Sequence, residues 1–316
     1  MNIYVELKLN SEERERVKKI AGADTLWIAD PEKRSEEDLQ ALKKAEIIFG
    51  NCSPSWLEKA EKLKWFQLIS VGFDDYIATS GNLVKKQVVS TNLSGFFAEP
   101  VAQTMLAGVL SLYRGLKTLE NLQSRKCWNK LEVRSQICTL RGARVLMLGS
   151  GSISNRFVEL IQPFECNVRI FARVERPGCI HRLEDLDALL PEIDILCSAL
   201  PETPSTKGLL SRDRLSKMKK GAILVNVGRG SLVDESALGE ALRSGVLGGA
   251  VLDVTMREPL PLEDPLWTCP NLILTQHTGG GSNDETDRKI SFFKENLQRY
   301  RSGKPLNGIV NWEKGY

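Results

Sequence analysis

The chain has 316 residues, which is enough for two domains of ordinary size, each with its own hydrophobic core. Its net charge is only +3 and its basic residues are scattered, so binding to nucleic acid is not expected. Charged residues follow Met1 too early for a signal peptide, and no apolar run reaches the length of a membrane span, which predicts a cytoplasmic protein with no membrane partner.

Cysteine and histidine counts limit the remaining classes. The seven cysteines form no Cys-x-x-Cys pair, and their odd number argues against a disulfide framework. The chain has only two histidines, His181 and His277, so no metal site is expected. His181 lies among charged residues, and we expect it to be solvated.

Short β-branched runs alternate with charged, helical stretches through the first ninety residues. This βαβ order predicts a parallel sheet covered by helices. The expected strands are Ile3 to Val5, Thr25 to Ile28, Ile47 to Phe49, Phe66 to Ile69 and Gln87 to Ser90.

A helix is expected from Val101, because apolar residues recur there every three or four positions and mark one buried stripe. This helix is long enough to link two domains. The stripe consists of Val101, Met105, Val109, Leu112 and Leu116.

A second series of strands and helices follows, and a charged helix near Asp284 to Arg301 closes the chain. The chain is therefore predicted to be an α/β protein with two doubly wound parallel-sheet domains. The expected strands of the second series are Ala143 to Leu148, Val168 to Ala172, Ile193 to Ser198, Ile223 to Val227, Ala250 to Val254 and Leu272 to Thr275.

A glycine turn joins the first strand of this second series to a helix. Gly149 allows a tight turn, and Gly151 lets the backbone approach a pyrophosphate held at the helix N-terminus, near Ser152 and Ile153. Ser154 stands where the dinucleotide-binding fingerprint has its third glycine, and it adds bulk between helix and strand. Such a turn can also be purely structural, but a strand before it and a helix after it favour a dinucleotide site.

The end of the next strand indicates which dinucleotide binds. A dinucleotide fold normally has an acid there for the ribose 2′-hydroxyl, whereas this chain has Ala172 followed by Arg173 and Arg176. Two guanidinium groups can hold a 2′-phosphate, so we expect a preference for NADP, with NAD still possible. The alternative is that both are ordinary surface arginines with Glu175 between them.

Three polar residues follow later strands of the series. Arg229, Glu258 and His277 each come after a buried run, so they can converge at one edge of the sheet. Arginine binds a carboxylate and polarises a carbonyl, and a glutamate beside histidine fixes its tautomer, which together make an acid catalyst beside an anion clamp. Taken singly, a glutamate before proline, such as Glu258 before Pro259, is more often a turn residue, and Asp234 is predicted to cap a helix.

These segments resemble the D-isomer-specific 2-hydroxyacid dehydrogenase family, and the resemblance covers nearly the whole chain. It is strongest between Gly149 and His277, where the family's motifs follow in order. They are Leu200-Pro201-x-Thr203-x-x-Thr206-x-Gly208-Leu209, Met218-Lys219-Lys220-Gly221-Ala222, Asn226-x-x-Arg229-Gly230-x-x-Val233-Asp234, Leu252-Asp253-Val254, Glu258-Pro259-Leu260-Pro261, Pro265-Leu266-Trp267 and Pro270-Asn271-Leu272.

The resemblance implies a dehydrogenase that transfers hydride between NADP or NAD and a 2-oxo acid or D-2-hydroxy acid, similar to glyoxylate and hydroxypyruvate reductases. Arg229 would bind and polarise the substrate, His277 would act as general acid or base, and Glu258 would orient His277. Ser70, Val71 and Gly72 resemble the loop that receives the substrate carboxylate. The remaining cofactor contacts that the resemblance implies are Leu200, Pro201, Thr206, Val227, Gly228, Asp253 and Gly279.

The resemblance also implies the domain plan and the assembly. A Rossmann cofactor domain, residues 96–285, would be inserted in a flavodoxin-like substrate domain made of residues 1–95 and 286–316. The stripe that begins at Val101 would serve in homodimer contacts, although it can equally pack within one chain.

The chain departs from the family at Ser154, at Gln103 in place of a glutamate, and at Gln276 in place of the proline before the histidine. None of these changes removes a catalytic group, but Gln276 can alter the approach of His277. Two rival functions remain: a nucleotide-sensing protein of the same fold without turnover, and a dehydrogenase for another acceptor.

Overall fold

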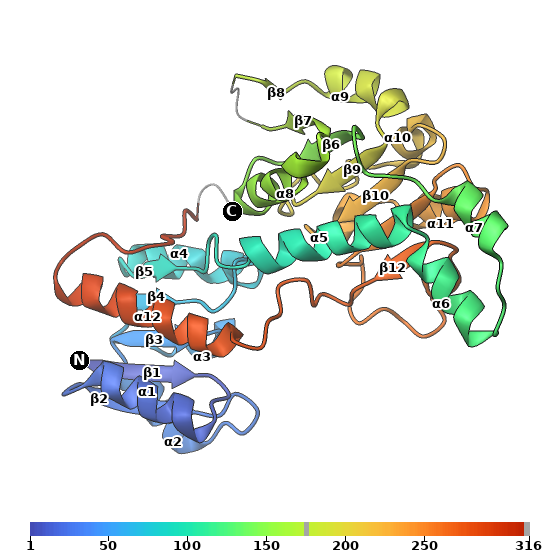
Figure 1. Ribbon diagram of the computed structural model, residues 1–316. Helices are drawn as coiled ribbons and strands as arrows, with labels where there is room; N and C mark the ends of the chain where they lie inside the picture. The colour runs from blue at the N-terminus through green and yellow to red at the C-terminus, as the bar shows by residue number, and fades with distance from the viewer. Residues whose placement is uncertain (174–176, 313–316) are drawn as a thin grey trace. The chain divides into compact units, whose positions relative to one another are not determined.

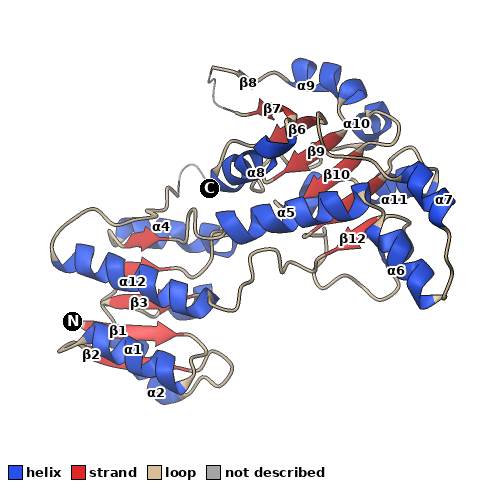
Figure 2. Ribbon diagram, viewed as in Figure 1, coloured by secondary structure: helices blue, strands red, loops and turns tan. Residues whose placement is uncertain are grey.

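The computed structural model describes residues 1–173 and 177–312. The chain folds into two compact units, one made of Met1–Phe96 with Ser282–Tyr316 and the other of Phe97–Gly281 (Figure 1). The second unit is therefore inserted between two stretches of the first. Each unit is a parallel sheet with helices packed on it, which confirms the predicted α/β class with two doubly wound sheets (Figure 2).

The first unit contains a five-stranded sheet in the order β2-β1-β3-β4-β5, and the strand pairs are all parallel. This is the flavodoxin-like order, in which the strand sequence reverses between β1 and β3. The strands are β1 (Asn2–Glu6), β2 (Thr25–Ala29), β3 (Ile47–Gly50), β4 (Trp65–Gln67) and β5 (Val89–Thr91), and the helices are α1 (Ser11–Ala21), α2 (Glu36–Lys44), α3 (Pro54–Leu57), the short 3-10 helix η1 (Asp74–Tyr76), α4 (Ile77–Lys85) and α12 (Glu285–Arg301).

Side chains alternate across this sheet and build one core on each face. Phe49 of β3 faces α12, where its ring stacks on Phe293 with 4.3 Å between the centroids. The neighbouring Ile48 faces the opposite core, which includes Leu57 and Leu83 from α3 and α4. The sheet is apolar on both faces because helices cover both, as expected for parallel strands.

The second unit contains a seven-stranded sheet in the order β12-β11-β10-β9-β6-β7-β8, again with parallel pairs. Its strands are β6 (Arg144–Leu148), β7 (Asn167–Phe171), β8 (Cys179–Ile180), β9 (Ile195–Ser198), β10 (Ile223–Asn226), β11 (Gly249–Leu252) and β12 (Leu272–Leu274). Its helices are α5 (Ala98–Tyr113), α6 (Leu116–Ser124), α7 (Lys130–Gln136), α8 (Ser152–Ile161), α9 (Leu183–Leu189), α10 (Arg212–Lys217) and α11 (Glu235–Arg243), with 3-10 turns η2 (Gln162–Phe164), η3 (Leu190–Glu192), η4 (Gly230–Leu232) and η5 (Pro265–Thr268).

The order of the second sheet is that of a Rossmann fold with one further strand. The chain leaves β6 toward β7 and β8, then crosses back so that β9 pairs with the other side of β6. This reversal between β6 and β9 is the topological switch point, where α/β proteins bind ligands. Two cores support it, one beneath α5 and α8 and one beneath α9, α10 and α11.

Helix α5 is shorter than the sequence predicts. Val101, Met105 and Val109 are buried as expected, but α5 ends at Tyr113 because Gly115 adopts the left-handed conformation, with φ 64°. Leu116 instead begins α6 and is 52% exposed, so the expectation of one continuous stripe through Leu116 is wrong. The helix lies wholly within the second unit, where its stripe packs on the sheet of that unit.

Two strand predictions also need correction. The fifth strand begins at Val89 rather than Gln87, because Gln87 has φ 55° and closes the preceding turn. The two-residue strand β8 is not expected from its sequence, yet it forms the outer edge of the second sheet.

Within the described ranges, none of the helices combines the length and the hydropathy that a membrane crossing requires.

Candidate active site

The glycine turn joins β6 to α8 in the second unit, at the switch point of its sheet. Gly149 has φ 103°, a backbone conformation that side chains disfavour, and Gly151 is the N-cap residue immediately before α8. A Cβ added to Gly151 meets open space, and no side chain of the described residues caps the helix at this end. The amides of the first turn, at Ser152 and Ile153, therefore form a cradle that fits a pyrophosphate.

Ser154 packs beneath this turn. Its side chain is 1% exposed, and its Oγ lies 3.5 Å from the position that a Cβ on Gly149 would occupy. Among the residues that the structure describes, this hydroxyl finds no hydrogen-bond partner. Serine is accommodated at the third position of the fingerprint, at the expense of one buried, unsatisfied hydroxyl.

The ends of β9 and β10 approach each other closely beside the turn. A Cβ on Gly228 would lie 2.3 Å from the carbonyl oxygen of Leu200, so this close contact requires glycine. Asn226 folds the segment, since its side-chain amide donates to the carbonyl of Arg229 at 2.8 Å. Thr206 organises the loop after Leu200 by donating from its hydroxyl to the carbonyl of Pro201 at 2.8 Å.

His277 and Glu258 are in direct contact. The Nδ1 atom of His277 lies 2.7 Å from Oε2 of Glu258, and the other carboxylate oxygen accepts the amide of Thr255 at 3.0 Å. An ionised carboxylate can only accept hydrogen bonds, so Nδ1 carries the proton in this pair and Nε2 is left for chemistry. The His277 side chain is 56% exposed, which makes its ring accessible to a ligand.

Asp253 anchors the segment around the histidine from the end of β11. Its carboxylate is buried and accepts the Thr275 hydroxyl at 2.6 Å and the Gly279 amide at 2.9 Å. Its carbonyl accepts the amide of His277 at 2.6 Å. One residue thus holds the chain both before and after the histidine.

Arg229 joins this group through its neighbour. A Cβ on Gly230 would lie 2.0 Å from the carbonyl carbon of Thr255, so the backbone after Arg229 lies directly against the turn that carries Glu258. The guanidinium of Arg229 is half-buried and donates to the carbonyl of Gly228 at 2.9 Å. The ends of β10, β11 and β12 therefore present the segments of Arg229, Glu258 and His277 at one edge of the sheet.

Gln276 and His277 both have left-handed backbone conformations, with φ 54° and 56°. Two successive residues of this kind outside glycine are uncommon and cost conformational energy. Proline fixes φ near −65°, so the proline that the family commonly has before the histidine cannot adopt the conformation seen at Gln276.

The expected ribose end of the cofactor lies at β7. Ala172 is buried and Arg173 is exposed, while Arg176 lies outside the described residues. His181 is half-buried rather than solvated, because its Nδ1 lies 2.9 Å from the carbonyl oxygen of Ala172. This contact could not be predicted from the sequence, since it depends on the pairing of β8 with β7.

The expected carboxylate loop belongs to the first unit. The Ser70 hydroxyl donates to the carbonyl of Gly72 at 2.7 Å, and Asn92 donates to the carbonyl of Val71 at 2.8 Å. Both carbonyls are therefore engaged in hydrogen bonds within the first unit. Val71 is 38% exposed.

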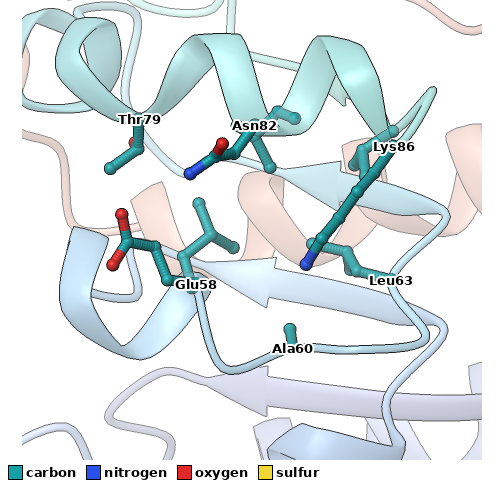
Figure 3. Close-up of a pocket in the computed structure, with 9 residues that line it drawn as sticks. Glu58, Ala60, Leu63, Thr79, Asn82 and Lys86 are labelled. Carbon is teal, nitrogen blue, oxygen red and sulfur yellow. The ribbon is translucent and has the colours of Figure 1, made fainter.

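Two hollows differ in what they can hold. The one beside His277 has a volume of about 430 Å³, within the usual range for small-molecule sites, and Glu258, Leu260, Trp267 and Gln276 help to line it. Figure 3 shows the other, between α3 and α4 of the first unit, where Glu58, Thr79 and Asn82 line it. Its volume is about 10 Å³, roughly that needed for one water molecule, so it is no substrate site.

Comparison with known proteins finds one matching family model, described as "D-isomer specific 2-hydroxyacid dehydrogenase, NAD binding domain", over residues 106–279. A glyoxylate/hydroxypyruvate reductase B from Pectobacterium carotovorum subsp. carotovorum (strain PC1) is 33% identical over 283 residues, which cover 87% of this chain and 88% of the relative.

Several solved structures resemble nearly the whole chain. A D-isomer specific 2-hydroxyacid dehydrogenase family protein from Aeromonas salmonicida subsp. salmonicida A449 matches with a TM-score of 0.82 and 32% identity, covering 98% of this chain and 99% of the other. A D-isomer specific 2-hydroxyacid dehydrogenase from Xanthobacter autotrophicus Py2, solved with NADPH and MES, matches with a TM-score of 0.81 and 26% identity, covering 99% and 100%.

Proposed function

The chain belongs to the D-isomer specific 2-hydroxyacid dehydrogenase family, and from this premise we propose that it reduces a 2-oxo acid to a D-2-hydroxy acid with His277 as general acid. The observation that carries the proposal is the 2.7 Å contact between Nδ1 of His277 and Oε2 of Glu258. A protein that only senses nucleotides has no need of this pair, whereas proton transfer to a carbonyl oxygen requires an acid such as His277.

In this proposal the bound nicotinamide supplies the hydride, and the side chains of the chain manage the proton and the charge. Glu258 holds the Nδ1 proton of His277, so Nε2 donates to the carbonyl oxygen in reduction and accepts the proton in oxidation. The guanidinium of Arg229 binds the substrate carboxylate and polarises the carbonyl. The loop of Ser70, Val71 and Gly72 belongs to the first unit and stays a predicted carboxylate-binding loop.

The proposed cofactor site follows the strand ends of the second unit. Gly149, Gly151, Ser152 and Ile153 fit the pyrophosphate, because the start of α8 offers open backbone amides there. The remaining proposed contacts come from the segments after β9, β10, β11 and β12, and they are Leu200, Pro201, Thr206, Val227, Gly228, Asp253 and Gly279.

The test is consumption of NADPH and NADH with a panel of acceptors that runs from glyoxylate and hydroxypyruvate to bulkier 2-oxo acids. The proposal predicts turnover of at least one 2-oxo acid. No turnover across the panel, together with tight binding of the dinucleotide, would instead establish a nucleotide sensor. Turnover of a carbonyl compound that lacks the carboxylate, at the same efficiency, would contradict the role of Arg229.

We also propose a preference for NADP. Arg173 is exposed at the end of β7, and the buried residue before it, Ala172, is not an acid that would repel a 2′-phosphate. The variant Arg173→Ala should raise the KM for NADPH more than the KM for NADH. Equal affinities of the unaltered protein for the two cofactors would refute this preference.

A homodimer is proposed as the working form. The stripe of α5 packs within its own unit, but Trp128 and Leu131, at the start of the α7 segment, are 91% and 82% exposed. Large apolar side chains with this exposure are typical of a covered interface. Sedimentation of the protein should give the mass of a dimer, and Trp128→Glu should shift it toward the monomer. A monomeric unaltered protein would refute the assignment.

A further inference from the structure

Glu235 is the first residue of α11, and its carboxylate contacts the backbone of a turn at a residue twenty-one positions further along the chain. Its Oε1 accepts the backbone amide of Met256 at 2.6 Å. Glu235 is half-buried, whereas Met256 is exposed. The contact ties the beginning of a core helix to the turn after β11.

The same turn carries Glu258. The amide of Thr255, next to that of Met256, donates to Oε1 of Glu258 at 3.0 Å, and Oε2 of Glu258 meets Nδ1 of His277 at 2.7 Å. Two carboxylates therefore hold two successive amides of one turn. Glu235 binds the turn to α11. Glu258 accepts the Thr255 amide of the same turn with one carboxylate oxygen and contacts His277 with the other.

The segment of Glu235 is itself firmly placed. Asp234 caps α11 by accepting the amide of Ala237 at 2.9 Å, and Leu238 and Leu242 of that helix lie in the core. Gly230, a few residues earlier, packs its backbone against Thr255. The turn therefore lies against a part of the unit that packs in the core, and Glu235 accepts a hydrogen bond from it there.

We propose that Glu235 is a positioning residue for the acid–base pair: by holding the Met256 amide it keeps the turn from Thr255 to Glu258 in the conformation that presents Glu258 to His277. This inference rests on the proposed function of His277. Glu235 touches neither substrate nor cofactor in this role, and it acts only through Glu258.

The electrostatic surroundings agree with such a role. Burial raises the pKa of Glu235 above its ordinary value, and the carboxylates of Asp264 and Glu258 raise it further, while the Met256 amide opposes this shift. These surroundings disfavour the ionised form of the Glu235 carboxylate.

Kinetics test the proposal with variants of one residue and a matched control on the same helix. Glu235→Ala removes the acceptor and should lower kcat by roughly 10- to 100-fold, with the KM for the cofactor unchanged. Glu235→Gln keeps an oxygen that can accept the Met256 amide and should restore most of the rate. Glu240→Gln removes an exposed charge from α11, where it pairs with Arg212, and should leave kcat unchanged.

Nitrogen NMR of the imidazole rings gives a readout that needs no turnover. The chain has only two histidines, and the signal of His277 is the one that disappears in His277→Gln. In the unaltered protein the neutral ring of His277 should carry its proton on Nδ1, because Glu258 accepts it there. Glu235→Ala should shift this tautomer toward Nε2–H, as Glu258→Gln should, whereas Glu235→Gln and Glu240→Gln should not.

The outcomes separate the two proposals. If the unaltered protein reduces no 2-oxo acid, the proposed function fails and the tautomer of His277 still decides the role of Glu235. If Glu235→Ala retains both the rate and the tautomer, Glu235 is not a positioning residue. If that variant does not fold, Glu235→Asp, whose shorter side chain withdraws the oxygen from Met256, replaces it with the same expected loss and the same refuting result.

Discussion

At the scale of single residues, the backbone before the histidine sets this chain apart. Gln276 has φ 54° and His277 has φ 56°, and their position is held by the bond from the His277 amide to the carbonyl of Asp253. The energy stored in such a pair is retained only where the surroundings fix it, which is common at functional sites.

The family's usual proline should therefore harm this protein. Gln276→Pro forces φ toward −65° and should destabilise the fold by about 1–3 kcal/mol while moving His277 and lowering kcat. Gln276→Gly, which tolerates positive φ, serves as the control and should keep the melting temperature or raise it. Chemical denaturation and steady-state kinetics measure both effects. A proline variant as stable and as active as the unaltered protein would show that the backbone here is not as described.

At the scale of elements, the ends of β10 and β11 depend on close approach of two backbones. A Cβ on Gly230 would lie 2.0 Å from the carbonyl carbon of Thr255 and 2.1 Å from its oxygen, and backbone cannot move aside as a flexible side chain can. Because Gly230 has no side chain, the segments that carry Arg229 and Glu258 can lie this close together.

Gly230→Ala should separate these segments. We expect a loss of stability of about 1–3 kcal/mol from overpacking, together with a fall in kcat larger than the change in the KM for the cofactor. Gly151→Ala is the matched control for stability, because its added Cβ meets open space. If the two variants unfold at the same denaturant concentration, the close approach at Gly230 does not constrain the fold.

The elements also show how far the sequence could be interpreted. Strand runs such as Ile47 to Phe49 were predictable because only apolar, β-branched segments fit a sheet covered on both faces. The contact of Glu258 with His277 was implied by the family motifs and is present at 2.7 Å, while their catalytic roles stay predictions. The hydrogen bond from the Met256 amide to Glu235 could not be predicted, since it depends on a loop conformation that the spacing of residues in the sequence does not encode.

The end of α5 was missed for a related reason. Apolar spacing continues through Leu116, but the left-handed conformation of Gly115 redirects the chain, and periodicity alone does not detect such a change. The prediction that His181 is solvated is wrong because it rests on the charged neighbours of His181 along the chain, whereas in the folded unit its Nδ1 contacts the carbonyl of Ala172.

At the scale of the whole molecule, the first unit is closed by an ion pair between distant parts of the chain. Arg301 of α12 donates to Asp24 at 2.6 Å, just before β2. Burial alone would raise the pKa of Asp24, but the hydrogen bond from Arg301 helps to lower it below the ordinary value. A lowered pKa means that the ionised carboxylate stabilises the fold above the ordinary value, and that this contribution is lost as the pH falls through the lowered value.

Asp24→Asn tests this linkage. The variant should melt about 2–4 °C below the unaltered protein at neutral pH, because the ion pair is partly shielded and its loss costs about 1 kcal/mol. The difference should shrink as the pH falls through the lowered pKa of Asp24, because below it Asp24 is protonated in the unaltered protein as well. Melting curves across this range provide the measurement. A difference that stays constant with pH would remove Asp24 from the acid stability of the fold.

The central claim, that His277 moves the proton, is tested most directly by His277→Gln. With the 2-oxo acid that the unaltered protein reduces best, kcat should fall by roughly 100- to 10,000-fold, the usual contribution of a general acid. The melting temperature and the dissociation constant of the cofactor, measured by fluorescence, should stay as they are, because the dinucleotide cradle at α8 does not include His277. A variant that keeps the turnover of the unaltered protein would contradict the account.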